Sequence, residues 1–345
     1  MFFLFRPLKR DLNSAEKMPE TMSELYPFTF TPHFKERVWG GRNIERLYGK
    51  ALPPNQVIGE SWEITDRPEG VSVIANGPLA GNSLRWLMEN HAGSLLGGNR
   101  ANVKTFPLLV KILDAQDKLS LQVHPPAAKA KELKGDPKTE MWFIADATPT
   151  ADLFVGLKRG VTRADFERKV ADGTVAECFH HIPVKAGDTM FLPSGRVHAI
   201  GAGNVIFEIQ QNSDTTYRVF DWNRLGLDGK PREMHVAQSL ASIDFNDFEP
   251  SLVKGEYSRS EVFSTRYLVD DPLFRTNAWQ FKSGSRFYVS NKLPQIFGVV
   301  RGRMTITANG VEVALKPGDF CLVPACPERV TIQSETAVEL LHVEF

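Results

Sequence analysis

A short motif that occurs twice in the second half of the chain restricts the fold more than any other feature. Gly187-Asp188 is followed by Pro193, six residues after its glycine, and Gly318-Asp319 is followed by Pro324 at the same spacing. Both copies follow β-rich stretches and lead into another strand, and such self-similarity indicates repeated structural units. The repeat therefore predicts two related β-barrel modules.

The two copies differ at the positions where a metal ligand could lie. Gly195 of the first copy aligns with Cys326 of the second, and His198 aligns with Arg329. Imidazole is a common metal ligand and guanidinium is not. We therefore expect the first module to carry the chemistry and the second to be degenerate.

The rest of the chain reads as mainly β with helical insertions. Apolar or alternating runs predict strands at 58–64, 106–113, 119–124, 138–144, 295–300, 303–307, 311–315, 320–323 and 329–333. Capping and stop signals predict helices at 82–93, 127–134, 162–173 and 233–239. Asn309-Gly310 predicts a tight hairpin turn. We divide the chain into a disordered extension (1–25), a catalytic domain with helical insertions (26–231) and a degenerate C-terminal domain (232–345).

Composition excludes several classes of partner. The 345 residues contain 41 Lys plus Arg and 41 Asp plus Glu, without a basic run, so neither nucleic acid nor an anionic membrane is expected to bind. The three cysteines (Cys178, Cys321 and Cys326) are odd in number and form no C-x-x-C motif. A disulfide framework is therefore not expected, and we predict a cytoplasmic protein.

Four residues form a candidate metal site: Gln122, His124, Glu140 and His198. Gln122 and His124 are two apart on a predicted strand and share a face. Imidazole and carboxylate ligands suit a divalent ion such as zinc without any thiolate. One histidine alone is more often structural, but two with a glutamate favour a metal site. Gln122 is the weaker candidate, because an amide is a poor ligand and could instead orient another ligand.

Two cations are candidates for binding substrate beside this site. Lys138 shares a strand face with Glu140, so it could relay protons or bind an anion, or be an ordinary solvated lysine. Arg218 could contact a phosphate or developing negative charge, or pair with a nearby aspartate. We favour the functional role because no other strong cation is expected near the metal set. Trp39 and Glu60 are tentative substrate-lining residues, although tryptophans in such segments are often core.

Six segments together resemble the type I phosphomannose isomerases of the short bacterial kind, within the cupin superfamily. They are Val38-Trp39-Gly40-Gly41, Ile58-Gly59-Glu60-Ser61-Trp62-Glu63, Leu119-Ser120-Leu121-Gln122-Val123-His124-Pro125, Lys138-Thr139-Glu140-Met141-Trp142, Pro193-Ser194-Gly195-Arg196-Val197-His198-Ala199 and Gln211-Asn212-Ser213-Asp214-Thr215-Thr216-Tyr217-Arg218-Val219. The resemblance spans about 26–345 and is most specific in 105–225. The chain departs from the family at Pro126 and Ala127, where acidic residues are frequent, and in its first 25 residues.

The resemblance implies two cupin-like jelly-roll modules and one zinc ion bound by His124, Glu140 and His198, with Gln122 as a further ligand. It also implies Arg218 as the catalytic arginine and Lys138 as a substrate-facing lysine. The expected substrate is a phosphorylated hexose, and the expected reaction interconverts mannose 6-phosphate and fructose 6-phosphate in a monomer or homodimer.

We expect the reaction to pass through a cis-enediol. A metal-bound water, Lys138 and Glu140 are open candidates for the base. Two alternatives use the same ligands. One is a cupin-type non-haem iron dioxygenase, and the other is a non-catalytic module that binds a sugar phosphate beside a structural metal.

Overall fold

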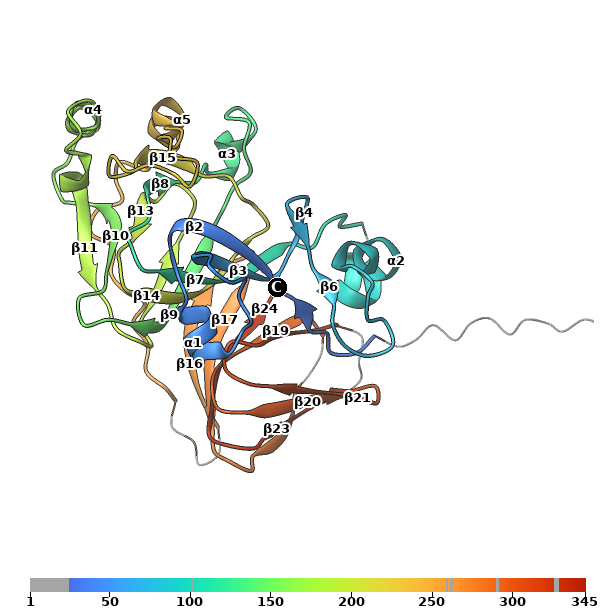
Figure 1. Cartoon of the computed structure of the whole chain (residues 1–345). Coiled ribbons are helices and arrows are strands. Elements are labelled where there is room, and N and C mark those ends of the chain that lie inside the picture. Colours follow the sequence, from blue (N-terminus) through green and yellow to red (C-terminus); the bar gives the residue numbers. More distant parts are fainter. Residues whose placement is uncertain (1–24, 101, 259, 261–262, 290–291, 326–328) are drawn as a thin grey trace, which may run out of the picture.

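The computed structural model describes residues 25–345, except 101, 259, 261–262, 290–291 and 326–328. The predicted disordered extension, apart from Leu25, lies outside the described residues, as does Cys326. Leu25 itself is buried, and its carbonyl accepts a hydrogen bond from the Asn309 side chain. The prediction of a mainly β protein with helical insertions is confirmed (Figure 1).

Four larger sheets contain most of the strands, and none of them closes into a barrel within the described residues. A six-stranded sheet has the order β12 (Thr189–Leu192), β9 (Glu140–Ala147), β14 (Asn204–Gln211), β7 (Leu108–Ala115), β3 (Ile58–Ile64), β2 (His33–Gly41). A five-stranded sheet has the order β11 (Phe179–Pro183), β10 (Asp152–Leu157), β13 (His198–Ile200), β8 (Leu121–Val123), β15 (Tyr217–Phe220).

The C-terminal part contributes the other two large sheets. A second five-stranded sheet has the order β16 (Phe263–Asp270), β17 (Arg275–Phe281), β24 (Val338–Glu344), β19 (Gln295–Arg301), β22 (Phe320–Val323). A four-stranded sheet has the order β18 (Arg286–Val289), β23 (Val330–Ser334), β20 (Met304–Ala308), β21 (Val311–Leu315). Two short pairs, β1 (Phe30–Thr31) with β6 (Val73–Ile74) and β4 (Asp66–Arg67) with β5 (Gly70–Val71), complete the strands.

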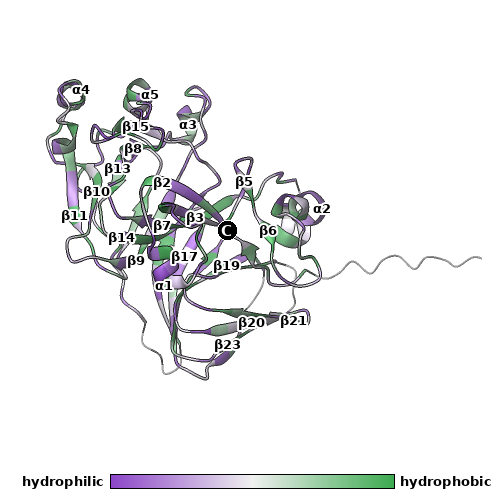
Figure 2. Cartoon of the chain, in the orientation of Figure 1, coloured by the Kyte–Doolittle hydropathy of each residue, from purple (hydrophilic) through white to green (hydrophobic). Residues whose placement is uncertain are grey.

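The four sheets are stacked by shared apolar cores. One core joins the five-stranded sheet of the first part to the six-stranded sheet, through residues such as Leu153 and Ile206. A second core joins the other face of the six-stranded sheet to the C-terminal five-stranded sheet, through Phe207 and Leu341. A third fills the space between the two C-terminal sheets. Apolar residues (green in Figure 2) accordingly run along many strands, because strands buried on both faces lose the polar alternation of surface strands.

Helices cover the outer surfaces of these layers. The helices are α1 (Asn43–Tyr48), α2 (Leu84–Leu96), α3 (Ala127–Ala130), α4 (Arg163–Ala171) and α5 (Val236–Ser242), with short 3₁₀ turns at Gly98–Arg100 and Val175–Cys178. Helices α3, α4 and α5 lie at the end of the molecule beside β8, β13 and β15 (Figure 1). A separate apolar core, which includes Phe166 of α4, packs beneath them.

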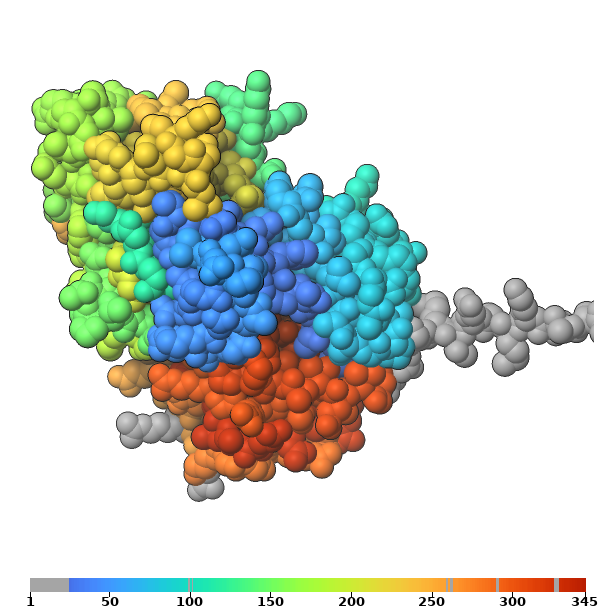
Figure 3. All heavy atoms as spheres, viewed as in Figure 1, coloured from blue at the N-terminus to red at the C-terminus, as the bar shows by residue number. Residues whose placement is uncertain are grey.

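The first described segment ties the two parts of the chain together. Phe28 exchanges backbone hydrogen bonds with Leu322 of β22, and Lys316 donates to the Tyr48 carbonyl. In the face shown in Figure 3, N-terminal residues (blue) lie between the C-terminal part (red) and the part drawn in green and yellow. This position explains why the largest apolar core contains residues from both ends of the chain.

Several predicted elements have the expected bounds, and others are displaced. The strands at 58–64, 311–315 and 320–323 are confirmed without change, and Thr162 caps α4 through a capping box. The prediction that helix α2 ends near Gly93 is wrong. The helix kinks at His91 and continues to Leu96, because Leu95 and Leu96 are buried in the core. Gly97, at φ 74°, ends the helix. Helix α5 begins at Val236, three residues after the predicted start.

The two copies of the repeated motif fold into the same turn. The amides of Gly187 and Gly318 donate to Ile144 and Val299, at 2.8 and 2.9 Å, and both glycines have positive φ, 89° and 82°. The carboxylates of Asp188 and Asp319 accept from the backbone amides of Lys185 and Lys316, at 2.9 and 3.0 Å. The repetition detected in the sequence is therefore a repetition of backbone geometry.

Candidate active site

Strand geometry gathers the charged residues of the site onto one face of the six-stranded sheet. In β9, β7 and β14, alternate residues point to the same side. Glu140, Lys111 and Glu208 therefore face the five-stranded sheet that contains β8, β10 and β13. Glu208 is the register partner of Lys111 on one neighbouring strand and of Trp142 on the other. In the facing sheet, Gln122 of β8 is paired with His198 on one side and Arg218 on the other. The site therefore lies between two sheets.

The three strongest predicted ligands converge within this space. His124 Nε2 lies 3.6 Å from Glu140 Oε1, and His198 Nε2 lies 3.3 Å from the same oxygen. Zinc–ligand bonds of about 2.0–2.1 Å put tetrahedral ligand atoms about 3.3 Å apart, so these separations suit a shared ion. Among the described residues, neither His124 Nε2 nor Glu140 Oε1 has a hydrogen-bond partner, while Glu140 Oε2 forms an ion pair with Lys138. The buried, unsatisfied atoms fit a bound cation.

Hydrogen bonds on the far side of each imidazole select the tautomer that a metal requires. Nδ1 of His124 lies 2.7 Å from the Thr215 carbonyl, and Nδ1 of His198 lies 3.0 Å from the Arg196 carbonyl. A carbonyl can only accept, so each Nδ1 donates and each Nε2 carries a lone pair directed into the site. Burial lowers the pKa of both histidines, that of His198 to about 3. Both rings are therefore neutral and able to bind a metal.

Glu140 is fully buried, yet it is held as a carboxylate. Burial acts to raise its pKa, but the charge of Lys138 acts in the opposite direction and holds the pKa well below its ordinary value. Lys138 Nζ lies 3.1 Å from Glu140 Oε2, which places the lysine beside the ligand set as the sequence predicted. The anion that a divalent ion prefers is thus available at neutral pH.

Gln122 lies at the edge of the ligand set. Its Nε2 is 3.3 Å from His198 Nε2, while its Oε1 is 3.3 Å from the Ser120 hydroxyl. The two ends of an amide are assigned from their hydrogen bonds, and rotating this amide by 180° exchanges them. The carbonyl oxygen would then occupy a position that suits a fourth ligand.

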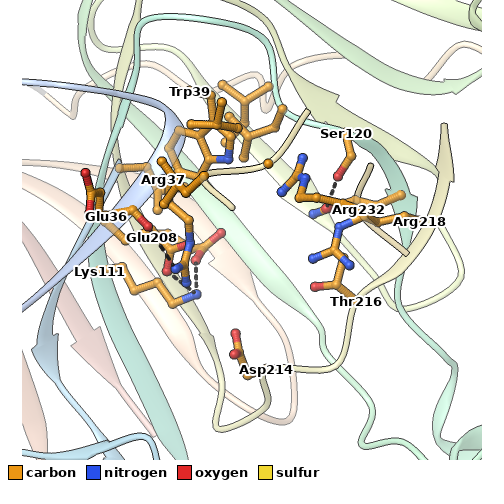
Figure 4. A pocket seen from close by; sticks show the side chains of 18 of the residues that line it. Glu36, Arg37, Trp39, Lys111, Ser120, Glu208, Asp214, Thr216, Arg218 and Arg232 are labelled. Atoms are coloured by element: carbon orange, nitrogen blue, oxygen red, sulfur yellow. Dashed lines mark hydrogen bonds and ion pairs between the residues drawn. The ribbon is translucent and has the colours of Figure 1, made fainter. Parts of the chain in front are cut away.

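A cavity of about 460 Å³ opens beside the ligand set, and one wall is a buried network of ion pairs (Figure 4). Lys111 Nζ lies 3.6 Å from Glu60 and 3.3 Å from Glu208, and Arg37 donates to Glu60 at 2.8 Å. Burial acts to raise the pKa of Glu60, but Lys111 and Arg37 prevail and depress it. Burial prevails at Glu208, which faces Lys111 and has a raised pKa. Two carboxylates in one cavity therefore differ in proton affinity.

The opposite wall carries two arginines and two hydroxyls. Arg218, Arg232, Ser120 and Thr216 line this side of the cavity in Figure 4, across from Lys111 and Glu208. Within the described part of the chain, no acceptor hydrogen-bonds Arg218 Nε, and no carboxylate forms an ion pair with this guanidinium. Burial and then repulsion by Arg232 lower the pKa of Arg218. This wall is suited to an anion.

Comparison with known proteins identifies the family. Residues 28–140 match the family model described as phosphomannose isomerase type I, catalytic domain. A mannose-6-phosphate isomerase from Streptococcus mutans is 36% identical over 299 residues, which are 86% of this chain and 92% of that protein. A mannose-6-phosphate isomerase from Bacillus subtilis is 35% identical over 302 residues, 86% of this chain and 93% of its own length. The chain belongs to the type I phosphomannose isomerase family.

Solved structures agree with this assignment. The crystal structure of a Bacillus subtilis mannose 6-phosphate isomerase superposes with a TM-score of 0.84 at 30% identity, covering 93% of this chain and 100% of the other. A mutant phosphomannose isomerase from Salmonella typhimurium superposes with a TM-score of 0.72 at 17% identity, over 92% of this chain and 99% of that chain, which shows a common fold. The fold of the type I phosphomannose isomerase family therefore extends over nearly the whole chain.

Within this type I phosphomannose isomerase fold, every predicted site residue lies at the ligand set or the cavity. Gln122, His124, Glu140 and His198 come together, and Lys138, Arg218, Trp39 and Glu60 line the adjacent cavity. The expectation that Arg218 would be the only strong cation near the metal set is wrong, since Lys111, Arg37 and Arg232 line the same cavity. Lys111 and Glu208 were not among the predicted site residues. Each is a charged residue inside an otherwise apolar strand, a pattern that indicates a buried charge with a partner.

The longest described helix, α2, has 13 residues, and no helix in the described ranges is both long and apolar enough to cross a bilayer.

Proposed function

We propose that this protein is a zinc-dependent aldose–ketose isomerase that interconverts mannose 6-phosphate and fructose 6-phosphate through a cis-enediol. The observation that carries the proposal is a buried His/Glu/His ligand set that opens onto a cavity lined by five basic side chains. A metal held by these ligands would polarise a carbonyl oxygen of the sugar, and Arg218, which has no ion pair among the described residues, could bind a phosphate. Curated relatives that cover most of the chain carry the same activity in their names.

In this proposal, His124, Glu140 and His198 hold the metal, and Gln122 supplies a fourth ligand after rotation of its amide. A bound divalent ion polarises a substrate oxygen and stabilises the negative charge that develops there. Lys138, at 3.1 Å from Glu140 and almost fully buried, adds a positive charge beside the same oxygens. Trp39 and Glu60 shape the cavity around the sugar.

The isomerisation moves a proton between C1 and C2 of the sugar, and this transfer requires a base. Glu208 fits this role better than Glu140. Glu140 has a strongly depressed pKa and faces three cationic or ligating groups, so it holds a proton poorly. Glu208 lines the cavity, and its pKa is raised by burial. Trp142 donates to its Oε1, at 2.9 Å, and no donor in the described residues hydrogen-bonds its Oε2. We assign proton transfer to that oxygen, with Lys111 beside it at 3.3 Å.

We also infer that the stacked sheets form two cupin-like jelly-roll modules, residues 26–231 with the site and residues 232–345 without one. Two observations support the division. Each part has two sheets around a core of its own, and each contains one copy of the Gly-Asp turn. Arg329, the counterpart of His198, is exposed and stacks on Tyr288 at 3.5 Å, away from any ligand set. A cytoplasmic location and a monomer or homodimer remain our predictions.

The function is tested by a coupled assay for fructose 6-phosphate formed from mannose 6-phosphate, before and after chelation. We expect turnover that is lost with the metal and restored by zinc. Arg218→Ala should abolish turnover while one zinc per chain is retained, and retained activity would refute the role of Arg218. Glu208→Gln should behave in the same way if Glu208 is the base.

The same measurements separate the alternatives. An iron dioxygenase would consume oxygen with an aromatic substrate and would not isomerise the sugar. A non-catalytic module would bind the sugar phosphate, measured by calorimetry, without any turnover. The unpaired Arg218 and the neighbouring Arg232 favour an anionic sugar over an aromatic substrate.

A further inference from the structure

The segment between β15 and α5, residues 221–235, is shaped by a strained backbone that its surroundings hold in place. Trp222 and Asn223 both have left-handed backbone conformations, φ 59° and 55°, which residues other than glycine rarely adopt. The Trp222 indole is fixed from two sides, because Nε1 donates to the Leu119 carbonyl at 2.7 Å and Lys118 Nζ lies 3.8 Å above the ring. Strain that is so firmly held is characteristic of functional segments.

A single buried carboxylate organises this segment. Asp221 accepts hydrogen bonds from Arg232 at 2.6 and 2.7 Å and from Arg224 at 2.9 and 3.1 Å, and its side chain is 4% exposed. Asp117 is a second partner of Arg224, at 3.2 Å, so Arg224 is shared between two carboxylates, whereas Arg232 forms its ion pair with Asp221 alone among the described residues.

The two arginines of this cluster face different surroundings. Arg232 lines the cavity together with Arg218, whereas Arg224 does not line it. Figure 4 draws Arg218 and Arg232 on the wall that also carries the hydroxyls of Ser120 and Thr216. Arg218 has no ion pair within the described residues, and Arg232 repels it. Asp214 and Asp228 also line the cavity, but in the described residues neither forms an ion pair with Arg218 or Arg232, so this wall presents two guanidinium groups to an anion in the cavity.

The segment cannot move freely away from Arg218. The His235 amide donates to the Arg218 carbonyl at 2.8 Å, and the Arg218 amide donates to His235 Nδ1 at 3.3 Å. Between these points, Gly226 closes a tight loop, because its backbone amide donates a hydrogen bond to the Lys230 carbonyl at 2.7 Å. Asp221 and His235 thus fix both ends, and Arg232 is presented to the cavity in a defined position.

We propose that Arg232, oriented by Asp221, contacts the phosphate group of the substrate together with Arg218 and makes the enzyme specific for phosphorylated sugars. This proposal rests on the proposed function and adds a specificity-determining residue to it. A phosphate ester carries close to two negative charges at neutral pH, which matches two convergent arginines. Asp221 is a positioning residue, since it acts only through Arg232.

The test compares Arg232→Met with the matched control Arg224→Met in the zinc-loaded protein. Both variants remove one guanidinium from the same carboxylate, but only the first removes one from the cavity. Because a charge-assisted pair contributes about 1.5–3 kcal/mol, we expect Arg232→Met to raise KM for mannose 6-phosphate about tenfold to a hundredfold, with a much smaller change in kcat. The inhibition constant of inorganic phosphate should weaken by a similar factor. Arg224→Met should leave both values within about twofold.

Two results would overturn the proposal: unchanged KM and phosphate inhibition in Arg232→Met, or equal weakening in Arg224→Met, which would indicate collapse of the segment. If Arg232→Met does not fold, Arg232→Lys keeps the charge but loses the paired hydrogen bonds, and it should give an intermediate KM. Calorimetric titration with inorganic phosphate needs no turnover. Should the wild type fail to isomerise mannose 6-phosphate, the proposed function fails, while phosphate binding still decides the role of Arg232.

Discussion

Removing the ammonium group of Lys111 should destabilise the fold by an amount that depends on pH. Lys111 lies 3.3 Å from Glu208, which is buried, and Glu208 has no second cation in an ion pair among the described residues. In Lys111→Met, Glu208 must stay charged without a partner or take up a proton. Taking up a proton costs an amount of free energy set by how far the pH lies above the usual pKa of 4.5, so this amount is the upper limit of the stability lost through Glu208.

At about 1.4 kcal/mol per pH unit, this upper limit is about 3.4 kcal/mol at pH 7 and falls to about 0.7 kcal/mol at pH 5, and because the pKa of Glu208 is already raised in the wild type, the measured loss should lie below it. The sign follows from proton binding. The folded variant holds a proton on Glu208 that the unfolded chain releases above its ordinary pKa, so the stability of the variant relative to wild type falls as pH rises. Glu60 adds less, because Arg37 still pairs with it at 2.8 Å.

The assay is urea unfolding of metal-free wild type and Lys111→Met at pH 5 and pH 7, followed by tryptophan fluorescence. Lys185→Met is the matched control, since this lysine is 83% exposed and, among the described residues, forms an ion pair with Asp188 alone. We expect the control to lose about 0.5 kcal/mol or less at both pH values. A loss in Lys111→Met that is equal at the two pH values, or larger at pH 5, would refute the reasoning.

Three further predictions concern the metal, a second buried carboxylate and the repeated turn. His198→Ala should lose the bound metal, measured by elemental analysis, and metal content near wild type would show that His198 is not a ligand. Glu60→Gln should lower the free energy of unfolding at pH 7 by about 1–3 kcal/mol. Because the pKa of Glu60 is depressed in the folded state, the difference in urea midpoint between wild type and variant should narrow as pH falls below about 4.5. A difference that stays constant with pH would contradict this cause. Gly318→Ala should cost about 2–4 kcal/mol, since its Cβ would lie 2.4 Å from Tyr48 Cγ, whereas Gly187→Ala, with nothing within 4 Å, should cost about 1 kcal/mol from its positive φ alone. Equal losses in urea unfolding would contradict the packing difference.

The members of the ligand set were predictable from residue type, since two histidines and a glutamate are the ligands that zinc prefers, and the spacing of two residues places Gln122 and His124 on one face. That these strands converge was predictable only from the resemblance to a known family. Lys111 and Glu208 were not predictable in the same way, because their meeting depends on the pairing of β7 with β14. These strands are far apart in the chain, and no local pattern specifies that register.

The same limit explains which strands were missed. The hairpin β20–β21 follows from Asn309-Gly310, whose positive φ angles of 47° and 74° suit a tight turn. Strands β16, β17 and β24 carry no such signal, and β17 pairs with β24 across a long stretch of chain. Their sequences become strand sequences only once the neighbouring strand is present, because β propensity reflects packing against that neighbour.

The repeated turn suggests why only one part of the chain carries the site. In the first part, buried charges at Glu60, Lys111 and Glu208 keep a cavity open between the sheets, since ionised side chains cannot pack as an apolar core does. In the second part, apolar side chains fill the space between the sheets, and the buried His342 stacks on Trp279 at a centroid separation of 3.9 Å. Burial lowers the pKa of His342 to about 3, so this ring is neutral. Its Nε2 contacts an amide, Gln295 at 2.8 Å, and His124, Glu140 and His198 form the only potential metal-binding cluster in the described residues. Arg329→His should therefore not create a metal site, because the described residues of this part place an apolar core between the sheets and bring no carboxylate into a ligand cluster.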